Sequence, residues 1–140
     1  MPNEKVIEFG AGNMSLKEML PQNSTYTPSD IVKRSKETVL CDLNNSIMFE
    51  LSRYNTEIFS GVLEYVYDID KVFEQLQPFI SHIVMSYACS DICKYDRLSH
   101  GWLSDYTKDE LVDIFRKNNY KVLNMEDWRG QTIFNLKKLT

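Results

Sequence analysis

The feature that constrains the fold most is a series of short apolar runs that end at polar residues or glycines. Glu8 and the glycine turn at 10–12 end the first run, Asp30 the second, Asp42 the third and Ser60–Gly61 the fourth. Runs of this length are typical of buried strands, and glycines after a strand let the backbone approach a ligand closely. In open α/β sheets, ligands bind outside the carboxyl ends of the strands. The pattern therefore predicts a ligand site built from strand ends.

The remaining elements follow from periodicity and capping signals. Strands are expected at 6–9, 25–30, 38–41, 57–62, 80–87, 120–124 and 132–136. Helices are expected from the capping box at 15–18 to Pro21, over 69–76 after Asp68, behind the capping box at 107–110 and, more weakly, over 47–54. This alternation predicts an α/β fold, a doubly wound and mostly parallel sheet with a C-terminal antiparallel hairpin that turns at 128–130.

The link between the second and third strands is unusually short. Only residues 31–37 separate them, whereas a parallel crossover usually takes a dozen or more residues. The helix that normally fills this crossover is therefore expected to shrink to about one turn.

Composition limits the classes of protein that this chain can belong to. With 140 residues, a 43% hydrophobic fraction and a net charge of −4, residues 1–140 are expected to form one minimal domain. The charge balance offers no basic stripe for nucleic acid, and no apolar stretch is long enough to span a membrane. The polar N-terminus lacks the pattern of a signal peptide, so a cytoplasmic protein is expected.

The cysteines and histidines indicate neither a disulfide framework nor a metal site. Cys41, Cys89 and Cys93 are odd in number, which fits a reducing compartment. With His82 and His100 as the two histidines, a closed structural zinc site is not expected. His82 lies inside an apolar strand and is expected to be a structural residue with its polar atoms satisfied.

Five segments in this order resemble the class I S-adenosylmethionine-dependent methyltransferases, the seven-stranded Rossmann-like group, and in particular its small-molecule members. The matching segments cover nearly the whole chain and are Val6–Gly12, Tyr26–Asp30, Val39–Leu43, Phe59–Val66 and Asp105–Leu111 followed by Asn119–Tyr120. The resemblance implies S-adenosyl-L-methionine as the cofactor and a small-molecule acceptor as the partner. The helix that relatives place before the first strand has no counterpart in the sequence given.

The resemblance also implies a role for each matching residue. Those expected to line the methionine portion of the cofactor are Glu8, Gly10, Ala11 and Gly12. Asp30 would accept hydrogen bonds from the ribose hydroxyls, and Ile31 would lie against the adenine. Asp42 would bind the adenine amino group, with Leu43 contributing its backbone amide. Ser60 and Gly61 would border the sulfonium and the methyl group that is transferred.

The catalytic base is less clearly indicated. His100 lies in the long loop over 88–104, next to Trp102, and a neutral imidazole there can take a proton from an acceptor. Histidines in loops are more often bystanders, and Tyr65 stands where relatives often carry histidine. Trp102 and Tyr106 either line the acceptor pocket or anchor the last helix.

Three functional hypotheses remain. The leading one is in-line methyl transfer to a small molecule, a sugar or another metabolite. The alternative is a non-catalytic module with the same fold that binds cofactor or a partner protein. A nicotinamide oxidoreductase is disfavoured, because Ser15 replaces the third glycine of the dinucleotide fingerprint and no basic partner for a pyrophosphate stands nearby. The oligomeric state stays open.

Overall fold

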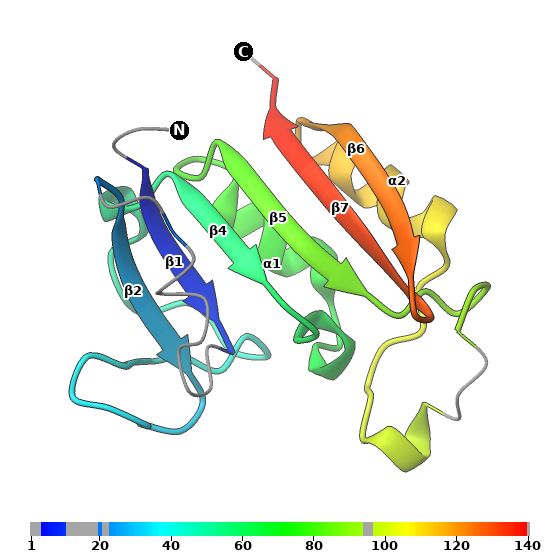
Figure 1. Ribbon diagram of the computed structural model, residues 1–140, viewed down its shortest axis with the longest axis horizontal. Helices are drawn as coiled ribbons and strands as arrows, with labels where there is room; N and C mark the ends of the chain where they lie inside the picture. Colours follow the sequence, from blue (N-terminus) through cyan, green and yellow to red (C-terminus); the bar gives the residue numbers. More distant parts are fainter. Residues whose placement is uncertain (1–3, 11–19, 21–22, 94–96, 140) are drawn as a thin grey trace.

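The computed structural model describes residues 4–10, 20, 23–93 and 97–139, and these form one seven-stranded sheet. The strands lie in the order β3-β2-β1-β4-β5-β7-β6 (Figure 1). Their bounds are Lys5–Phe9 for β1, Thr25–Asp30 for β2, Val39–Leu40 for β3, Thr56–Phe59 for β4, His82–Tyr87 for β5, Tyr120–Trp128 for β6 and Gln131–Lys138 for β7. All pairs from β3 to β5 are parallel, and the two pairs that involve β7 are antiparallel. The expected mixed α/β sheet with a closing hairpin is confirmed.

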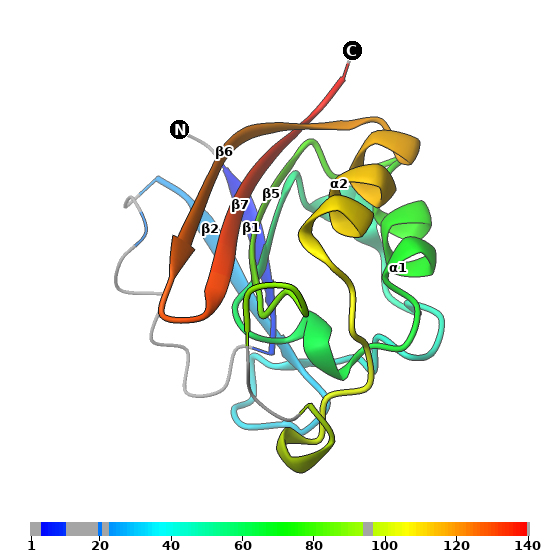
Figure 2. The same ribbon diagram turned by 90° about the vertical axis from the view of Figure 1, so that its right-hand side faces the viewer.

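Two α-helices cover the same face of this sheet (Figure 2). They are α1, Ile69–Leu76, in the crossover from β4 to β5, and α2, Lys108–Lys117, in the connection from β5 to β6. Asp68 caps α1 by accepting a hydrogen bond from the Lys71 amide at 3.2 Å. Three short 3-10 turns complete the described elements: η2 at Leu51–Arg53, η3 at Leu63–Tyr65 and η4 at Leu98–His100.

The capping box expected before α2 is present in full. The Thr107 hydroxyl accepts from the Glu110 amide at 3.2 Å, and the Glu110 carboxylate accepts from the Thr107 amide at 2.9 Å. We expect Thr107→Ala to lower the free energy of unfolding by about 1 kcal/mol, since one end of this reciprocal cap is lost. Urea unfolding measures the change, and Ser52→Ala, at an exposed hydroxyl, is the control. Equal stability of Thr107→Ala and the parent would contradict this role of the cap.

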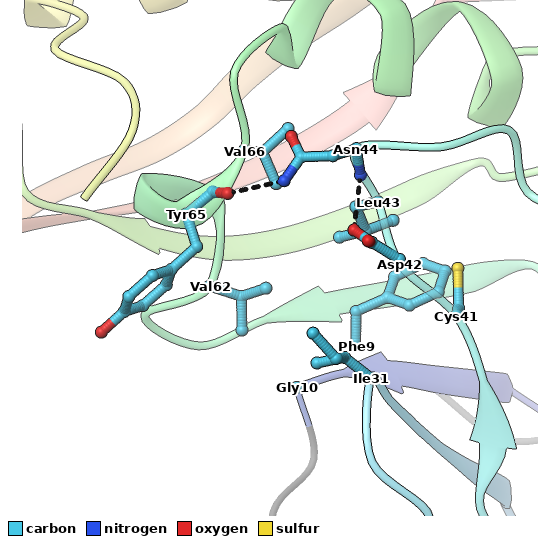
Figure 3. A pocket seen from close by; sticks show the side chains of 10 residues that line it. All are labelled: Phe9, Gly10, Ile31, Cys41, Asp42, Leu43, Asn44, Val62, Tyr65 and Val66. Atoms are coloured by element: carbon cyan, nitrogen blue, oxygen red, sulfur yellow. Dashed lines mark hydrogen bonds between the residues drawn. The ribbon is translucent and has the colours of Figure 1, made fainter. Parts of the chain in front are cut away.

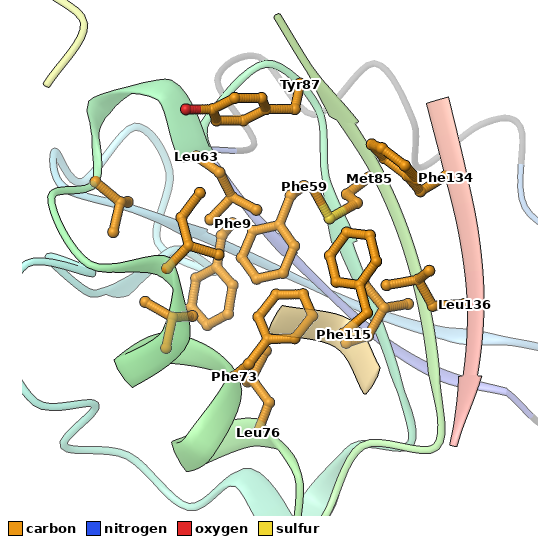
Figure 4. Packing of buried hydrophobic residues seen from close by; sticks show 14 of the residues in the cluster. Phe9, Phe59, Leu63, Phe73, Leu76, Met85, Tyr87, Phe115, Phe134 and Leu136 are labelled. Atoms are coloured by element: carbon orange, nitrogen blue, oxygen red, sulfur yellow. The ribbon is translucent and has the colours of Figure 1, made fainter. Parts of the chain in front are cut away.

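The hydrophobic core lies between the sheet and the two helices (Figure 4). Phe73 of α1 stacks on Phe115 of α2 with ring centroids 5.3 Å apart, and Phe115 meets Phe134 of β7 edge-on at 5.0 Å. Phe9 and Phe59 stack at 5.4 Å on the neighbouring strands β1 and β4. These rings are almost completely buried. The core therefore fixes the carboxyl ends of the central strands relative to one another.

The other face of the sheet is partly open. Parallel partners share a face, so Glu8 lies on the same side as Ile58 and Val84, opposite the core. Ile133 extends this surface onto β7 and is 37% exposed.

None of the helices in the described ranges is long and apolar enough to cross a membrane.

The expected helix over 47–54 was wrong. Only η2 forms there, and Glu50 just before it is extended. The apolar residues Ile47, Phe49 and Leu51 recur at every second position, which suits an extended chain and not a helix. The Ile47 amide donates to the Gln75 side chain of α1 at 2.8 Å, which ties the start of this segment to the helix.

Strand lengths also differ from the expectation in places. The third strand is only two residues long, and the fourth ends at Phe59 because Gly61 takes a left-handed φ of +63°. The closing strands extend further than expected, up to a turn at Arg129 and Gly130, which both have positive φ. Between β2 and β3 the chain makes one β-turn, in which the Thr38 amide donates to the Ser35 carbonyl at 3.2 Å. The crossover is therefore as short as expected.

Candidate functional site

A hollow of about 440 Å³ opens at the carboxyl ends of the central strands (Figure 3). It is lined by residues that follow β1, β2, β3 and β4, together with Phe9 of β1 itself: Phe9, Gly10, Ile31, Cys41, Asp42, Leu43, Asn44, Val62, Tyr65 and Val66. Of the residues singled out from the sequence, Gly10, Ile31, Asp42 and Leu43 meet here. We refer to this space as the first hollow.

Gly10 is required by its surroundings. Its φ is +69°, and a Cβ atom at this position would lie 2.3 Å from Cγ2 of Val62, in the segment that follows β4. The turn after β1 therefore lies directly against the turn after β4. A side chain at position 10 would both strain the backbone and push the two sides of the first hollow apart.

Asn44 joins two of the loops that line the first hollow, a contact that the sequence did not indicate. Its side-chain amide donates to the Tyr65 carbonyl at 3.0 Å, and its side-chain oxygen accepts from the Tyr67 amide at 2.8 Å. Asp42 holds the start of the same loop, because its Oδ1 accepts from the Asn44 amide at 3.0 Å. Only the fold brings these residues together, since 21 positions separate Asn44 from Tyr65.

Asp30 lies at the end of β2 as expected, but its carboxylate already has partners. Oδ1 accepts from the Ile31 amide at 2.8 Å, and Oδ2 lies 3.3 Å from Nε of Arg34. The side chain is 9% exposed and does not line the first hollow. Ile31 itself is 69% exposed, so its apolar side chain forms an open edge of the hollow.

Glu8 lines a second hollow, of about 660 Å³, on the open face of the sheet. The other side chains around it are mainly apolar, among them Ile58, Val84 and Ile133, with Ser60 at the end of β4. The Tyr26 hydroxyl donates to Oε1 of Glu8 at 2.5 Å. Burial raises the pKa of Glu8, and the hydrogen bond from Tyr26 offsets part of that rise.

The two hollows lie on either side of the segment that follows β4. Ser60 lines the second hollow and Val62 the first. Between them, the Gly61 amide donates to the Ser86 hydroxyl of β5 at 2.8 Å. Ser86 thus fixes the segment expected to border the transferred methyl group, a further contact that the sequence did not indicate.

Two buried carboxyl groups also escaped the sequence analysis. Glu57 of β4 is completely buried on the core side, and neither of its carboxyl oxygens has a hydrogen-bond partner among the described residues. Glu64 of η3 is 1% exposed, and its Oε2 accepts from the Ala88 amide at 2.8 Å. Burial raises the pKa of both carboxyls. Glu64 interrupts the otherwise apolar run 62–66, which is the signal that could have identified it, whereas Glu57 follows the polar Asn55 and Thr56.

His100 lies at the end of η4, exposed, and lines neither hollow. Its ring centroid is 4.8 Å from that of Trp102. The next residue, Gly101, faces Tyr65: a Cβ atom there would lie 3.8 Å from the Tyr65 ring. This loop therefore reaches the edge of the first hollow through Tyr65, while Tyr106 contacts Tyr87 and the Tyr67 carbonyl instead.

Some expectations fall elsewhere or beyond the described ranges. Ala11, Gly12 and the helix expected from Ser15 lie outside the described residues. His82 is part-buried on the open face, where its Nε2 lies 2.6 Å from Oδ1 of Asn135. Within residues 4–10, 20, 23–93 and 97–139, no cluster of three or more metal-ligating side chains occurs.

The first hollow suits an adenosyl group chemically. Ile31, Leu43 and Val62 offer apolar contacts for the two faces of a purine, and Asp42 and Asn44 bring polar atoms to its edge. Gly10 lets a ligand approach the backbone at the end of β1. The lining therefore offers a ligand both apolar and polar contacts at the strand ends.

Comparison with known proteins bears on the fold. No protein-family model matches the sequence, and no curated protein matches it. Among solved structures, an S-adenosylmethionine-dependent methyltransferase from Mesorhizobium loti superposes with a TM-score of 0.82 at 11% identity, over 98% of this chain and 92% of that one. Magnesium protoporphyrin IX methyltransferase from Synechocystis, with bound S-adenosylhomocysteine, gives 0.71 at 16% identity, over 99% and 75%.

A third similar structure is a complex of the Haloferax volcanii Trm112 methyltransferase activator with a second protein, with a TM-score of 0.70 at 10% identity, over 98% of this chain and 83% of the matched chain. The sheet order and these superpositions define the class: the fold is that of the class I S-adenosylmethionine-dependent methyltransferases. The resemblance seen in the sequence is confirmed at the level of the fold.

Proposed function

We propose that this protein binds S-adenosylmethionine in the first hollow and transfers its methyl group to a small-molecule acceptor. The observation that carries the proposal is the close contact of Gly10 with Val62, which leaves a glycine-lined hollow at the strand ends of a methyltransferase-type sheet. The similar structures support the choice of cofactor, since one of them holds S-adenosylhomocysteine.

In this proposal, Ile31 and Leu43 hold the adenine between apolar side chains, with Asp42 and the Leu43 amide at its edge. Asp30 binds the ribose hydroxyls, which requires its carboxylate to exchange the exposed Arg34 for the ligand. Ala11 and Gly12 continue the turn at Gly10 along the methionine chain.

The transfer end of the proposed site lies between β1 and β4. Bound S-adenosylmethionine supplies an electrophilic sulfonium methyl, so the protein has mainly to hold the acceptor in line with it. Glu8 is the carboxylate available for the positive end of the methionine portion, and Ser60 and Gly61 border the reacting methyl. His100 takes the proton of the acceptor.

A matched pair of neighbouring residues tests the cofactor site. Ile31 lines the first hollow and is 69% exposed, whereas Val32 is 53% exposed and does not line it. We expect Ile31→Ala to weaken S-adenosylhomocysteine binding about 5- to 30-fold. This factor corresponds to the loss of about 1–2 kcal/mol of binding free energy from apolar contact. Val32→Ala should change the affinity less than twofold, and both variants should keep the stability of the parent.

Calorimetric titration gives both affinities, and the rise of the melting temperature with added S-adenosylhomocysteine is an independent measure. Equal affinities for the two variants would place the ligand away from Ile31. A parent protein without any shift at millimolar ligand would contradict the proposed cofactor altogether.

A second candidate function is a non-catalytic module with this fold. It is favoured because the Asp30 carboxylate, which would bind the ribose, already has hydrogen-bond partners within the protein. Its Oδ1 is held by the backbone amides that follow it, and its Oδ2 faces Arg34. Such a module would serve as a partner surface, and the activator complex among the similar structures shows that methyltransferase-type chains occur with partner proteins. Cofactor binding without methyl transfer across a broad panel of acceptors would favour this candidate.

A further inference from the structure

Arg97 occupies a central place in the loop that follows β5, and the proposed function does not use it. Its Nη1 donates to the Ala88 carbonyl at 2.6 Å, and its Nε donates to the Ser104 carbonyl at 2.7 Å. Ala88 is the first residue after β5, and Ser104 lies just before the cap of α2. One guanidinium therefore joins the two ends of the loop.

Both joined residues are held from a second side by η3. The Ala88 amide donates to Oε2 of the buried Glu64, and the Ser104 amide donates to the Glu64 backbone carbonyl at 3.2 Å. The Leu103 amide donates to the same carbonyl at 2.7 Å. Glu64 and Arg97 thus hold the ends of the loop between them. Burial raises the pKa of Glu64, and the Arg97 charge offsets part of that rise.

Two aromatic rings lie against this same guanidinium, Trp102 of the loop and Tyr87 at the end of β5. Cζ of Arg97 lies 5.0 Å from the ring centroid of Trp102 and 5.5 Å from that of Tyr87. The ring centroid of His100 lies 4.8 Å from that of Trp102. The Trp102 amide closes the local turn by donating to the Arg97 carbonyl at 2.9 Å.

We propose that Arg97 is a positioning residue that joins the two ends of this loop and holds Trp102 and His100 beside Tyr65, as a preformed wall on the acceptor side of the site. Arginine suits this role, because its planar fork can donate to two carbonyls while one face stacks on an indole. Arg97 lines neither hollow, so the role is separate from cofactor binding. The assignment of the wall to the acceptor rests on the proposed function.

Three variants test this role in the whole chain. Arg97→Met keeps the length of the side chain but removes its donors and charge, and Arg97→Lys keeps the charge without the fork. Arg53→Met is the matched control, since Arg53 pairs with the exposed Glu50 on the surface. Each is made in a Trp128→Phe background, so that Trp102 is the sole source of tryptophan emission.

In Arg97→Met we expect amide hydrogen exchange at Ala88, Leu103 and Ser104 to accelerate at least tenfold while core amides of β5 stay protected. Trp102 emission should shift to the red as its ring gains water. Arg97→Lys should show more than half of the increase in exchange rate and of the emission shift that Arg97→Met shows. Arg53→Met should match the parent in both measurements. S-adenosylhomocysteine affinity, measured by calorimetry, should change less than threefold in all variants.

Unchanged exchange and emission in Arg97→Met would overturn the proposal, as would an equal acceleration at every core amide, which marks a general loss of stability. Exchange and emission in Arg97→Lys equal to those of the parent would show that the charge suffices and that the planar guanidinium is not required. If the parent does not bind S-adenosylhomocysteine, the proposed function fails, whereas the exchange and emission data still decide the role of Arg97.

Discussion

Gly10→Ala is expected to destabilise the protein strongly and to abolish the first hollow as a binding site. An L-residue at a φ of +69° costs about 1–2 kcal/mol on its own. The new Cβ would also lie 2.3 Å from Cγ2 of Val62, so the Val62 side chain or one of the two turns must shift. We expect a loss of about 3 kcal/mol or more in the free energy of unfolding, since both costs act together.

The chain supplies a control and a rescue for this prediction. Gly130, in the turn between β6 and β7, has a φ of +78° with no atom within 4 Å of an added Cβ, so Gly130→Ala reports the backbone cost alone. Combining Gly10→Ala with Val62→Ala removes the clashing methyl and should recover part of the lost stability. Urea unfolding and S-adenosylhomocysteine titration give both readouts. A Gly10→Ala variant as stable as Gly130→Ala would show that the two turns are not in contact.

The arrangement of strands could be predicted because each apolar run is local in sequence. α1 was placed correctly, because Asp68 caps its start and an apolar stripe follows at helical spacing. The segment 47–54 was misassigned, because its alternating apolar residues carry the period of an extended chain. The Ile47 amide is also bonded to the Gln75 side chain of α1, a contact that forms only in the folded protein.

The site was only partly predictable, for the same reason. Residues at strand ends, such as Gly10 and Asp42, could be found because a parallel sheet brings all its carboxyl ends to one edge. Asn44, Tyr26 and Arg97 act through contacts with residues that are far away in sequence or outside any strand. Those contacts exist only once the loops are packed. The engagement of Asp30 by Arg34 likewise depends on the conformation of the shortened crossover.

The burial of Glu57 makes stability depend on pH in a defined direction. Burial raises the pKa of this carboxyl well above its usual value. Between the unfolded pKa of about 4.3 and the higher folded pKa, the folded protein keeps a proton that the unfolded chain releases. The free energy of unfolding therefore falls as the pH rises through this window, by up to about 1.4 kcal/mol per pH unit.

Replacing this carboxyl separates the cost of ionisation from the cost of burying polar atoms. Glu57→Gln should match the parent near pH 4.5 and exceed its stability at pH 8, because the amide cannot ionise. Glu57→Leu should be more stable still, by about 1–4 kcal/mol at pH 8, since it also removes two oxygens that have no partner among the described residues. Glu126→Leu, on the exposed strand β6, is the control and should leave the pH profile unchanged.

Two neighbouring groups give an independent readout of the same charge. Burial raises the pKa of Cys41, to about 12, and of Tyr120, and the negative charge of Glu57 adds to both shifts. In Glu57→Leu both groups should titrate at lower pH, which thiol reactivity and tyrosine absorbance can follow. Glu8 and Glu64 also have raised pKa values, so part of the slope of stability with pH must survive in Glu57→Leu. A Glu57→Leu protein that is less stable than the parent at pH 8 would contradict this account. It would mean that the carboxylate has a partner in solution, because an unpaired buried charge destabilises the folded state.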